Sequence, residues 1–403
     1  MRVLASDVVE VSEPQAREAP AEQGVAEPDP AVPDLESTPA KTEPTESAPG
    51  GAADAPTKPA ADKIPHYITG FVTARDLMLN REYEAAYKSL QHYGINHRDD
   101  AIEAVGEALL EVLSMAEQRD FRRTQRLDAV FARARIAAHS WIPKAPDPVF
   151  ASMLAGVSDA INATWLLKTG SKLSGLNMAL GAINRIEDAA KAADPSLDAR
   201  GFYAMYLYMR GRYGSRYIPF VKDTRNVGRI GVEKCVKEAP TMGPLCHLFL
   251  LYVAKWERRW DDLDKLGDKF REKYPASMFA ALIQAEGLLA AQKPEKALSV
   301  LVDVARFDPN FPLHHLWMGR VYWEGLVQPL PAEEFVNLAL KEGLNQKTRI
   351  SEAHTVLAEI AMTQGYFAEA KIRIDWALEF DSDNKRAEID EEKLDDLMKK
   401  AQP

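Results

Sequence analysis

A helical pattern that returns after 34 residues is the feature that most constrains what this chain can fold into. Pro275 and Pro309 each close a helical stretch and stand 34 residues apart. Between them, apolar residues recur at three- and four-residue spacing, the period of a helix with one buried face. A unit of this length is a pair of helices that cannot bury its apolar face alone, so neighbouring pairs must stack. The sequence therefore predicts a solenoid of helix pairs.

The clearest unit, residues 351–384, resembles the tetratricopeptide repeat family. Its first helix carries Ala358 and Ala361, a turn follows at Gly365, and its second helix carries Ala370. In the family, small residues at such offsets leave a gap that larger residues of the neighbouring helix fill. The resemblance implies an all-α fold, a right-handed superhelical solenoid of stacked antiparallel helix pairs whose first helices line a concave face.

Three further units keep this pattern, at residues 244–277, 278–311 and 312–350. The unit 312–350 opens with Trp317 and Gly319, close to the family's aromatic and glycine positions, but it is five residues longer than the others. We expect the extra residues in a turn at 328–331, where two prolines interrupt the helical pattern.

Composition divides the chain into four parts. Residues 1–64 hold ten prolines and no aromatic residue, so we expect a disordered Pro/Ala/Glu-rich tail that acts as an inert spacer or carries a short binding motif. Residues 65–243 are expected to form divergent helical repeats with a Tyr/Arg-rich insertion near 213–224. Residues 244–384 form the tetratricopeptide-like repeats, and residues 385–403 a C-terminal capping helix.

The charge distribution argues against nucleic acid as a partner. The chain has a net charge of −10, of which −8 falls in residues 1–64, so the remainder is nearly neutral. Sequence-independent affinity for nucleic acid requires a basic surface that neutralises phosphates. A protein or peptide partner is the better expectation.

The N-terminal residues lack the long apolar stretch of a signal peptide, because Asp7 and Glu10 interrupt it. The apolar windows at 149–167 and 245–254 are expected to be buried helices, the first broken by Asp159 and the second too short to span a bilayer. We therefore expect a cytoplasmic protein without a membrane span. A periplasmic or envelope-associated location is the alternative if the true start lies upstream.

The chain has two cysteines, Cys235 and Cys246, too few for a disulfide framework or a common structural zinc site. Buried free thiols are the expectation, and a bond between the two is the alternative, open to them if they lie on neighbouring antiparallel helices.

No signature of a common enzyme class occurs in the sequence, neither a zinc-protease, a hydrolase-elbow, a P-loop nor a dinucleotide-binding motif. Residues 169–172 are expected to form a turn rather than a phosphate loop. His314 and His315 are adjacent, so on a helix they point about 100° apart and cannot both face one ion with His354. We expect no catalytic, cofactor-binding or metal-binding residues.

Two groups of residues are candidates for binding a partner. The family places peptide-binding side chains on the first helices, and the matching positions here are Tyr252, Lys255, Trp256, Glu286, Arg320 and Trp323. A mixed aromatic and charged lining suits a helix or an extended apolar peptide. The alternative is that Trp256 and Trp323 only fill the packing between repeats.

The second group lies in the Tyr/Arg-rich insertion and comprises Tyr213, Arg216 and Tyr217. Tyrosine and arginine are enriched at binding hot spots. The alternative is that these tyrosines are core of an oversized repeat. The sequence thus predicts a non-enzymatic scaffold that binds a protein on its helical repeats, or alternatively a structural component of a bacterial envelope or membrane-associated assembly, with the tail as linker.

Overall fold

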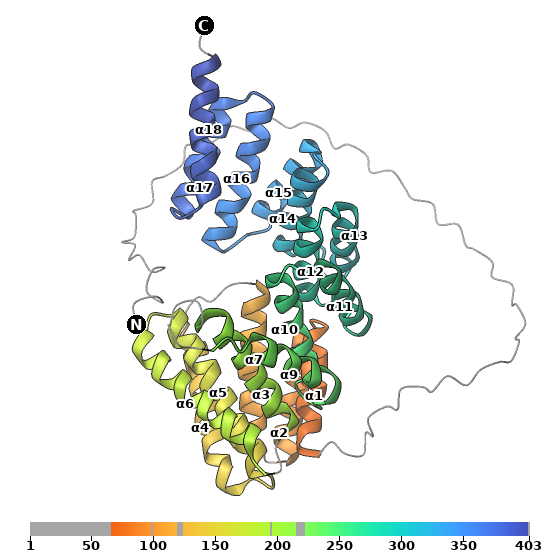
Figure 1. Ribbon diagram of the computed structural model, residues 1–403, viewed down its shortest axis with the longest axis vertical. Coiled ribbons are helices and arrows are strands. Elements are labelled where there is room, and N and C mark those ends of the chain that lie inside the picture. The colour runs from red at the N-terminus through yellow and green to blue at the C-terminus, as the bar shows by residue number, and fades with distance from the viewer. Residues whose placement is uncertain (1–65, 98–99, 119–123, 194–195, 215–221, 402–403) are drawn as a thin grey trace, which may run out of the picture. The chain divides into compact units, whose positions relative to one another are not determined.

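The described part of the chain is helical throughout (Figure 1). The computed structural model describes residues 66–97, 100–118, 124–193, 196–214 and 222–401. Within these ranges every regular element is a helix, and successive helices contact one another. This confirms the all-α fold of stacked helix pairs for these residues. The predicted tail lies outside them.

The first half of the body runs from α1 to η3. Its elements are α1 (His66–Leu79), α2 (Tyr83–His97), α3 (Asp100–Gln118), α4 (Gln125–Trp141), the short 3-10 helix η2 (Ile142–Lys144), α5 (Pro148–Lys168), α6 (Lys172–Lys191), α7 (Leu197–Met209) and the π-helical turn η3 (Arg210–Gly214).

The second half contains the regular repeats. Its elements are α9 (Arg225–Glu238), α10 (Gly243–Trp256), α11 (Trp260–Lys273), α12 (Met278–Ala290), α13 (Pro294–Ala305), α14 (Pro312–Arg320), the π-helical segment η4 (Val321–Gly325), α15 (Pro329–Lys341), α16 (Lys347–Thr363), α17 (Phe367–Phe380) and α18 (Lys385–Ala401).

A three-residue turn with a left-handed middle residue joins the helices of most pairs. It follows α1, α5, α10, α12, η4 and α16. The middle residue is a glycine only after α5 and α16, at Gly170 and Gly365. Elsewhere a side chain is held at positive φ, as at Gln292 with φ 58° and Val327 with φ 55°. The backbone N–H groups of such turns bond the last carbonyls of the preceding helix, which reverses the chain over a short distance.

Small residues bring the helices of each pair close together. Ala285, Ala297 and Ala370 are fully buried, as the repeat pattern required. Around Ala297 the core includes Leu301 and Leu316, and it extends without a break from α12 through α16. Each pair therefore buries apolar side chains between its own two helices and also against its neighbours.

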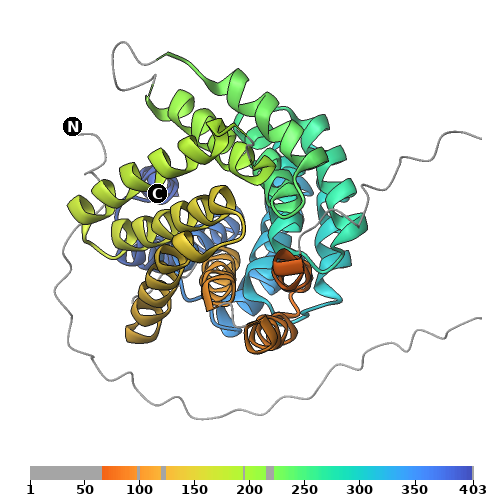
Figure 2. The same ribbon diagram turned by 90° about the horizontal axis from the view of Figure 1, so that it is seen from below.

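Helix α1 packs against helices far away in sequence (Figure 2). Both views place α1, in red-orange, beside the green-to-teal helices α10 and α11. The guanidinium of Arg75 donates hydrogen bonds to the carbonyl oxygens of Pro240, at 3.1 Å, and Thr241. The hydroxyl of Tyr274, the residue that follows α11, donates to the carboxylate of Asp76 at 2.7 Å. The divergent and regular repeats therefore share one body.

The prediction of a turn at residues 328–331 is wrong. Helix α15 begins at Pro329, and the turn is the preceding segment 326–328. Proline suits the first turn of a helix because its missing N–H would have no partner there. The π-helical segment η4 lengthens the first helix of this unit and accommodates part of the insertion, since a π-helix takes an additional residue per turn.

One described helix, Pro148–Lys168, is long and apolar enough to cross a membrane by length and composition, but 72% of its most apolar window is buried inside the body. Its buried residues include Asp159. This agrees with the expectation of a buried helix at 149–167.

The expectation of free thiols is wrong. Cys235 and Cys246 form a disulfide that joins the last turn of α9 to the first turn of α10. The two helices are neighbours joined by a short connection, which brings the two Cα atoms to 6.2 Å, within the range of a bridge. Sequence spacing alone could not give the direction of the two Cβ atoms.

The left-handed turns provide a test of the repeat geometry. Val327 is β-branched, held at φ 55°, and 73% exposed. Val327→Gly should raise the free energy of unfolding by about 1 kcal/mol, because it relieves the left-handed strain and removes no buried contact. The same change at Val302, an exposed helical position in α13, should lower it by roughly 0.5 kcal/mol. Urea unfolding of both variants measures the two effects, and a loss of stability in Val327→Gly would contradict the turn conformation.

Candidate protein-interaction surface

Side chains of successive first helices contact one another along one face of the regular repeats. We call this the first-helix face, formed by α10, α12, α14, η4, α16 and α18. Its connecting side chains are Lys255, Glu286, Arg320, Trp323, Glu359 and Arg386. The positions predicted from the repeat register therefore lie on one surface, and each of these side chains reaches the first helix of a neighbouring pair.

At the α10–α12 end, this face is aromatic. Lys255 forms an ion pair with Glu286. The Tyr252 ring lies 5.4 Å from that of Trp256 and 5.7 Å from that of Phe279. Burial, with a contribution from Glu286, raises the pKa of Tyr252 to about 12. This hydroxyl therefore stays protonated at physiological pH.

Trp256 serves the packing between repeats. Its ring stacks with that of Tyr208 from α7 at 6.2 Å, and the guanidinium of Arg212 from η3 lies over it at 4.8 Å. The residue therefore links the regular repeats to the segment before them, which matches the packing alternative for Trp256. Sequence reasoning treated the Tyr/Arg-rich segment and the groove as separate sites, whereas Arg212 and Trp256 are in contact.

Helix α1 contributes to the apolar core at this end. Leu79 is 5% exposed and belongs to the same apolar cluster as Leu248, Tyr252 and Phe279. The turn after α1 is held by Arg81, which forms a 2.8 Å ion pair with Asp308. A helix from the start of the body thus packs beside the α10–α12 end.

The α14–α18 end carries a network of ion pairs. Arg320 pairs with Glu324 at 2.8 Å and with Glu352 at 2.5 Å. Arg386, from α18, pairs with Glu324 and with Glu359, each at 2.6 Å. These side chains are partly exposed, from 16% for Glu359 to 35% for Arg386. This end is thus partly open to solvent, as are Lys255 and Glu286 at the α10–α12 end.

Trp323 is the aromatic member of this end. Its indole N–H donates to the Glu359 carboxylate at 2.6 Å, and the ring is half-buried. The bond orients the indole between η4 and α16. Trp323 therefore also matches the packing alternative in part, while one side of it remains at the surface.

Electrostatics keep this network charged. Burial lowers the pKa of Arg386, but the carboxylates of Glu359 and Glu324 raise it by more, and the net shift is upward. Burial raises the pKa of Glu324, yet Arg320 and Arg386 lower it below its ordinary value. Both partners are held in their charged forms.

Sequence reasoning missed Arg386, although a signal was present. The capping helix was treated as an end piece, but α18 continues the register of first helices, and Arg386 is its second residue. Extending the position rule by one unit would have placed it on this face.

Only part of the Tyr/Arg-rich insertion can be compared with the prediction. The side chain of Tyr213, and the whole of Arg216 and Tyr217, lie outside the described residues. In the described part, Tyr208 is fully buried, and its hydroxyl bonds Glu257 at 3.1 Å. Tyr203 bonds Glu187 at 2.8 Å. Both are packed between helices, as the core alternative for the segment expects.

The histidines lie in the core of the repeats. His314 is fully buried, and burial together with its neighbour His315 lowers its pKa to about 3. His354 packs against Trp376 and Phe380, and its pKa is lowered to about 4 mainly by burial. Within the described residues, no group of three or more His, Cys, Asp or Glu side chains is arranged to hold a metal ion.

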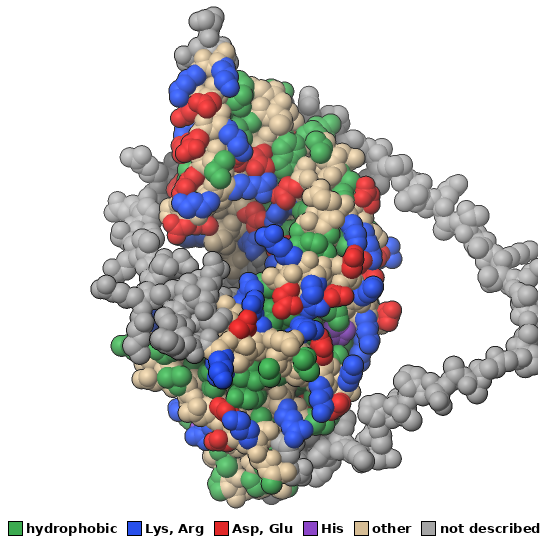
Figure 3. Space-filling view, in the orientation of Figure 1, with side chains coloured by type: hydrophobic (Ala, Val, Ile, Leu, Met, Phe, Trp, Pro, Cys, Tyr) green, Lys and Arg blue, Asp and Glu red, His purple; other side chains and the backbone are tan. Residues whose placement is uncertain are grey.

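Positive and negative side chains are interspersed on the face of the molecule seen in Figure 3. Among the described residues of that face, acidic and basic groups alternate along α18 and across the helices below it. The described surface there carries interspersed acidic and basic side chains and no extended patch of a single charge sign.

Comparisons with known proteins find similarity only among solved structures. No protein-family model and no curated protein matches the chain. A thermophilic TPR protein of Thermus thermophilus aligns with 48% of this chain and 98% of its own length, at 21% identity and a TM-score of 0.38. The C-terminal part of a TPR repeat-containing protein from Cytophaga hutchinsonii aligns with 79% and 98%, at 15% identity and a TM-score of 0.28. At these TM-scores the likenesses carry no further argument, and the described helix pairs themselves carry the fold.

The buried histidines predict a pH dependence of stability. Because their folded pKa values lie below the ordinary 6.5, the unfolded chain binds more protons between pH 6.5 and the folded values. Stability should therefore fall as pH drops through this window, by up to about 1.4 kcal/mol per pH unit for each group. In urea unfolding, the free energy of unfolding of His314→Leu should fall less steeply with decreasing pH than that of the wild type. Parallel pH curves for the two proteins would contradict a neutral, buried His314.

The ion-pair network predicts a second effect on stability. Arg386→Met removes the cation that two partly buried carboxylates share, and it should cost about 1–2 kcal/mol, a value reduced by the partial exposure of the arginine. Lys385→Met, one residue earlier and 78% exposed, should change stability by less than about 0.5 kcal/mol. The free energy of unfolding of both variants is measured in urea. Equal decreases would contradict a stabilising role of Arg386 in the ion-pair network.

Proposed function

We propose that this chain is a non-enzymatic scaffold that binds a protein partner, presented as a helix, on the α14–α18 end of the first-helix face. The observation that carries the proposal is the partly exposed lining of this end, where Trp323 lies beside the paired charges of Arg320, Arg386 and Glu359. An aromatic side chain flanked by charged groups is the kind of lining that helix-in-groove recognition uses.

The α14–α18 end supports this reading by what it exposes. Its cations are Arg320, Arg349 and Arg386, and its anions are Glu324, Glu352 and Glu359, so the two signs balance. Trp323 adds a half-buried aromatic surface beside them. Such a lining favours a partner with an apolar stripe flanked by both acidic and basic residues. It does not favour a polyanion, which would meet the carboxylates as well.

A structural role in a bacterial envelope assembly is the second candidate. The Cys235–Cys246 bond favours it, because disulfides persist in oxidising compartments and are rare in the cytosol. The same observation favours the periplasmic or envelope location over the cytoplasmic one. In both candidates the repeats bind a protein and do not catalyse a reaction.

The proposal can be tested with two tryptophans of the same repeats. Trp323 lies on the first-helix face, and Trp376 lies on the second helix α17, where it is 42% exposed. In affinity capture from a lysate of the source organism, Trp323→Ala should lose a partner at least about tenfold, since aromatic anchors supply about 2 kcal/mol or more. Trp376→Ala should retain it.

Both variants are compared after thermal melting confirms that they remain folded. Loss of the partner from both variants, or from Trp376→Ala alone, would move the site to another surface. Retention by both would contradict a role for the α14–α18 end.

A further inference from the structure

The disulfide lies at a joint of three helices. It ties α9 to α10, and both helices pack against α7. At Gly201 in α7, a Cβ atom would overlap the sulfur of Cys235 and lie 3.1 Å from that of Cys246. Glycine at this position therefore leaves the room that the two sulfurs occupy. The bond also spans the boundary between residues 65–243 and the regular repeats.

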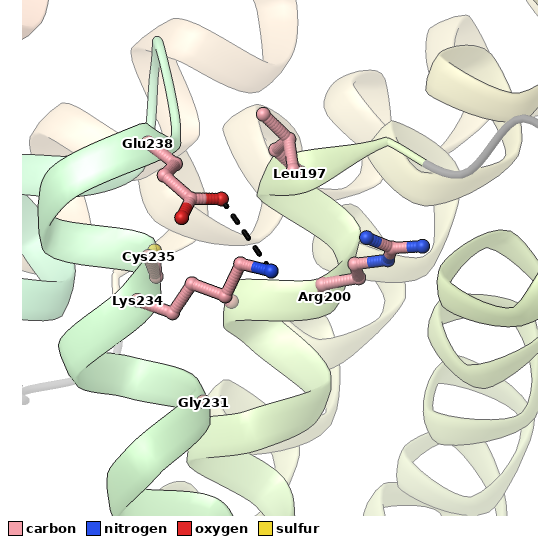
Figure 4. Close-up of a pocket in the computed structure, with 7 residues that line it drawn as sticks. Leu197, Arg200, Gly231, Lys234, Cys235 and Glu238 are labelled. Atoms are coloured by element: carbon pink, nitrogen blue, oxygen red, sulfur yellow. Dashed lines mark ion pairs between the residues drawn. The ribbon is translucent and has the colours of Figure 1, made fainter.

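The two sulfurs differ in access. Cys246 is fully buried, whereas Cys235 is 4% exposed and forms part of the wall of a cavity between α7 and α9 (Figure 4). The cavity has a volume of about 140 Å³. An enclosed space of about 150 Å³ accepts a molecule the size of benzene, so this one has room for the thiol end of a small molecule, whose remainder would stay outside, and not for a protein loop.

The lining of the cavity is polar at its rim. Lys234 and Glu238 of α9 lie beside Cys235, with the Lys234 ammonium 3.7 Å from the Glu238 carboxylate, whereas the guanidinium of Arg200 on α7 points away from them. The rim beside Cys235 is therefore an ion pair of one cation and one anion. Gly231 adds no side chain on the α9 side, which helps to keep the space open.

We propose that Cys235 is a site of thiol–disulfide exchange with a small thiol. The thiolate of the incoming molecule attacks the Cys235 sulfur and forms a new S–S bond with it. The bond to Cys246 breaks, and its electron pair remains on the Cys246 sulfur as a thiolate. The incoming sulfur is oxidised and the Cys246 sulfur is reduced, so no other oxidant or reductant is needed.

The direction of the exchange follows from position. Of the two sulfurs, Cys235 is the one that faces this cavity, so it is the sulfur that is attacked. Cys246 lies in the first turn of α10, where the backbone N–H groups and the helix dipole favour an anion, which suits a leaving thiolate. Because Cys246 stays beside Cys235, it can attack the mixed bond and expel the small thiol. The modification is therefore reversible, and it releases the covalent tie between α9 and α10 while it lasts.

The test compares the two sulfurs with one probe. Cys246→Ser and Cys235→Ser each leave a single thiol, and each folded variant is incubated with glutathione disulfide and analysed by intact mass and peptide mapping. Cys235 should form the glutathione adduct at least about tenfold faster than Cys246, because buried thiols are poorly accessible. Equal rates, or a faster reaction at Cys246, would overturn the proposal.

A measurement on the wild-type chain does not depend on the folding of these variants. Reduced glutathione is added, the reaction is quenched with acid, and free thiols are alkylated at low pH. The adduct should map to Cys235 and the alkyl group to Cys246, and the reverse pattern would overturn the assignment. If the protein purified in an oxidising buffer has two free thiols, the disulfide on which the proposal depends does not form.

Discussion

The structure depends on the close approach of helices at small residues. Ala297 and Ala370 are fully buried where the two helices of a pair meet, and the apolar side chains around them extend the core into the next pair. A helix pair of this size has too little apolar surface to be stable by itself, so each pair relies on its neighbours. The continuity of this core from α12 to α16 is what gives the first helices a common face.

The polar side chains of that face act between pairs. Arg320 and Arg386 each bind carboxylates on more than one helix, and Trp323 joins η4 to α16 through Glu359. These contacts orient neighbouring first helices, whereas the apolar core between the helices holds them together. The same side chains are partly exposed, so the residues that orient the helices are also those that we propose for recognition. The contacts of the two tryptophans support the packing interpretation, and the binding interpretation stays a prediction.

Helix α1 ties the start of the body to the regular repeats. Arg75 and Asp76 bind the connection between α9 and α10 and Tyr274 at the end of α11, and Leu79 joins the apolar cluster of α10 and α12. The first helix of the body therefore helps to hold the α10–α12 end in place. The disulfide lies on the same joint between the divergent and regular repeats, close to the connection that Arg75 contacts. The disulfide and the hydrogen bonds of Arg75 thus both lie where the divergent repeats end and the regular repeats begin.

The sequence by itself determined the helical period, the 34-residue repeat and the buried alanines, because these follow from local spacing that each unit carries in full. It also located several residues of the first-helix face but not Arg386, since the shared register was followed only as far as residue 384. Only the tertiary structure decided that α1 packs beside α10, because Leu79 and Leu248 of one apolar cluster are about 170 positions apart, a pairing that no local pattern records. The left-handed turn at Val327 and the pairing of Cys235 with Cys246 were likewise decided only by the tertiary structure. Each depends on the direction in which a backbone or side chain points after the helices have packed, and packing between distant segments sets that direction.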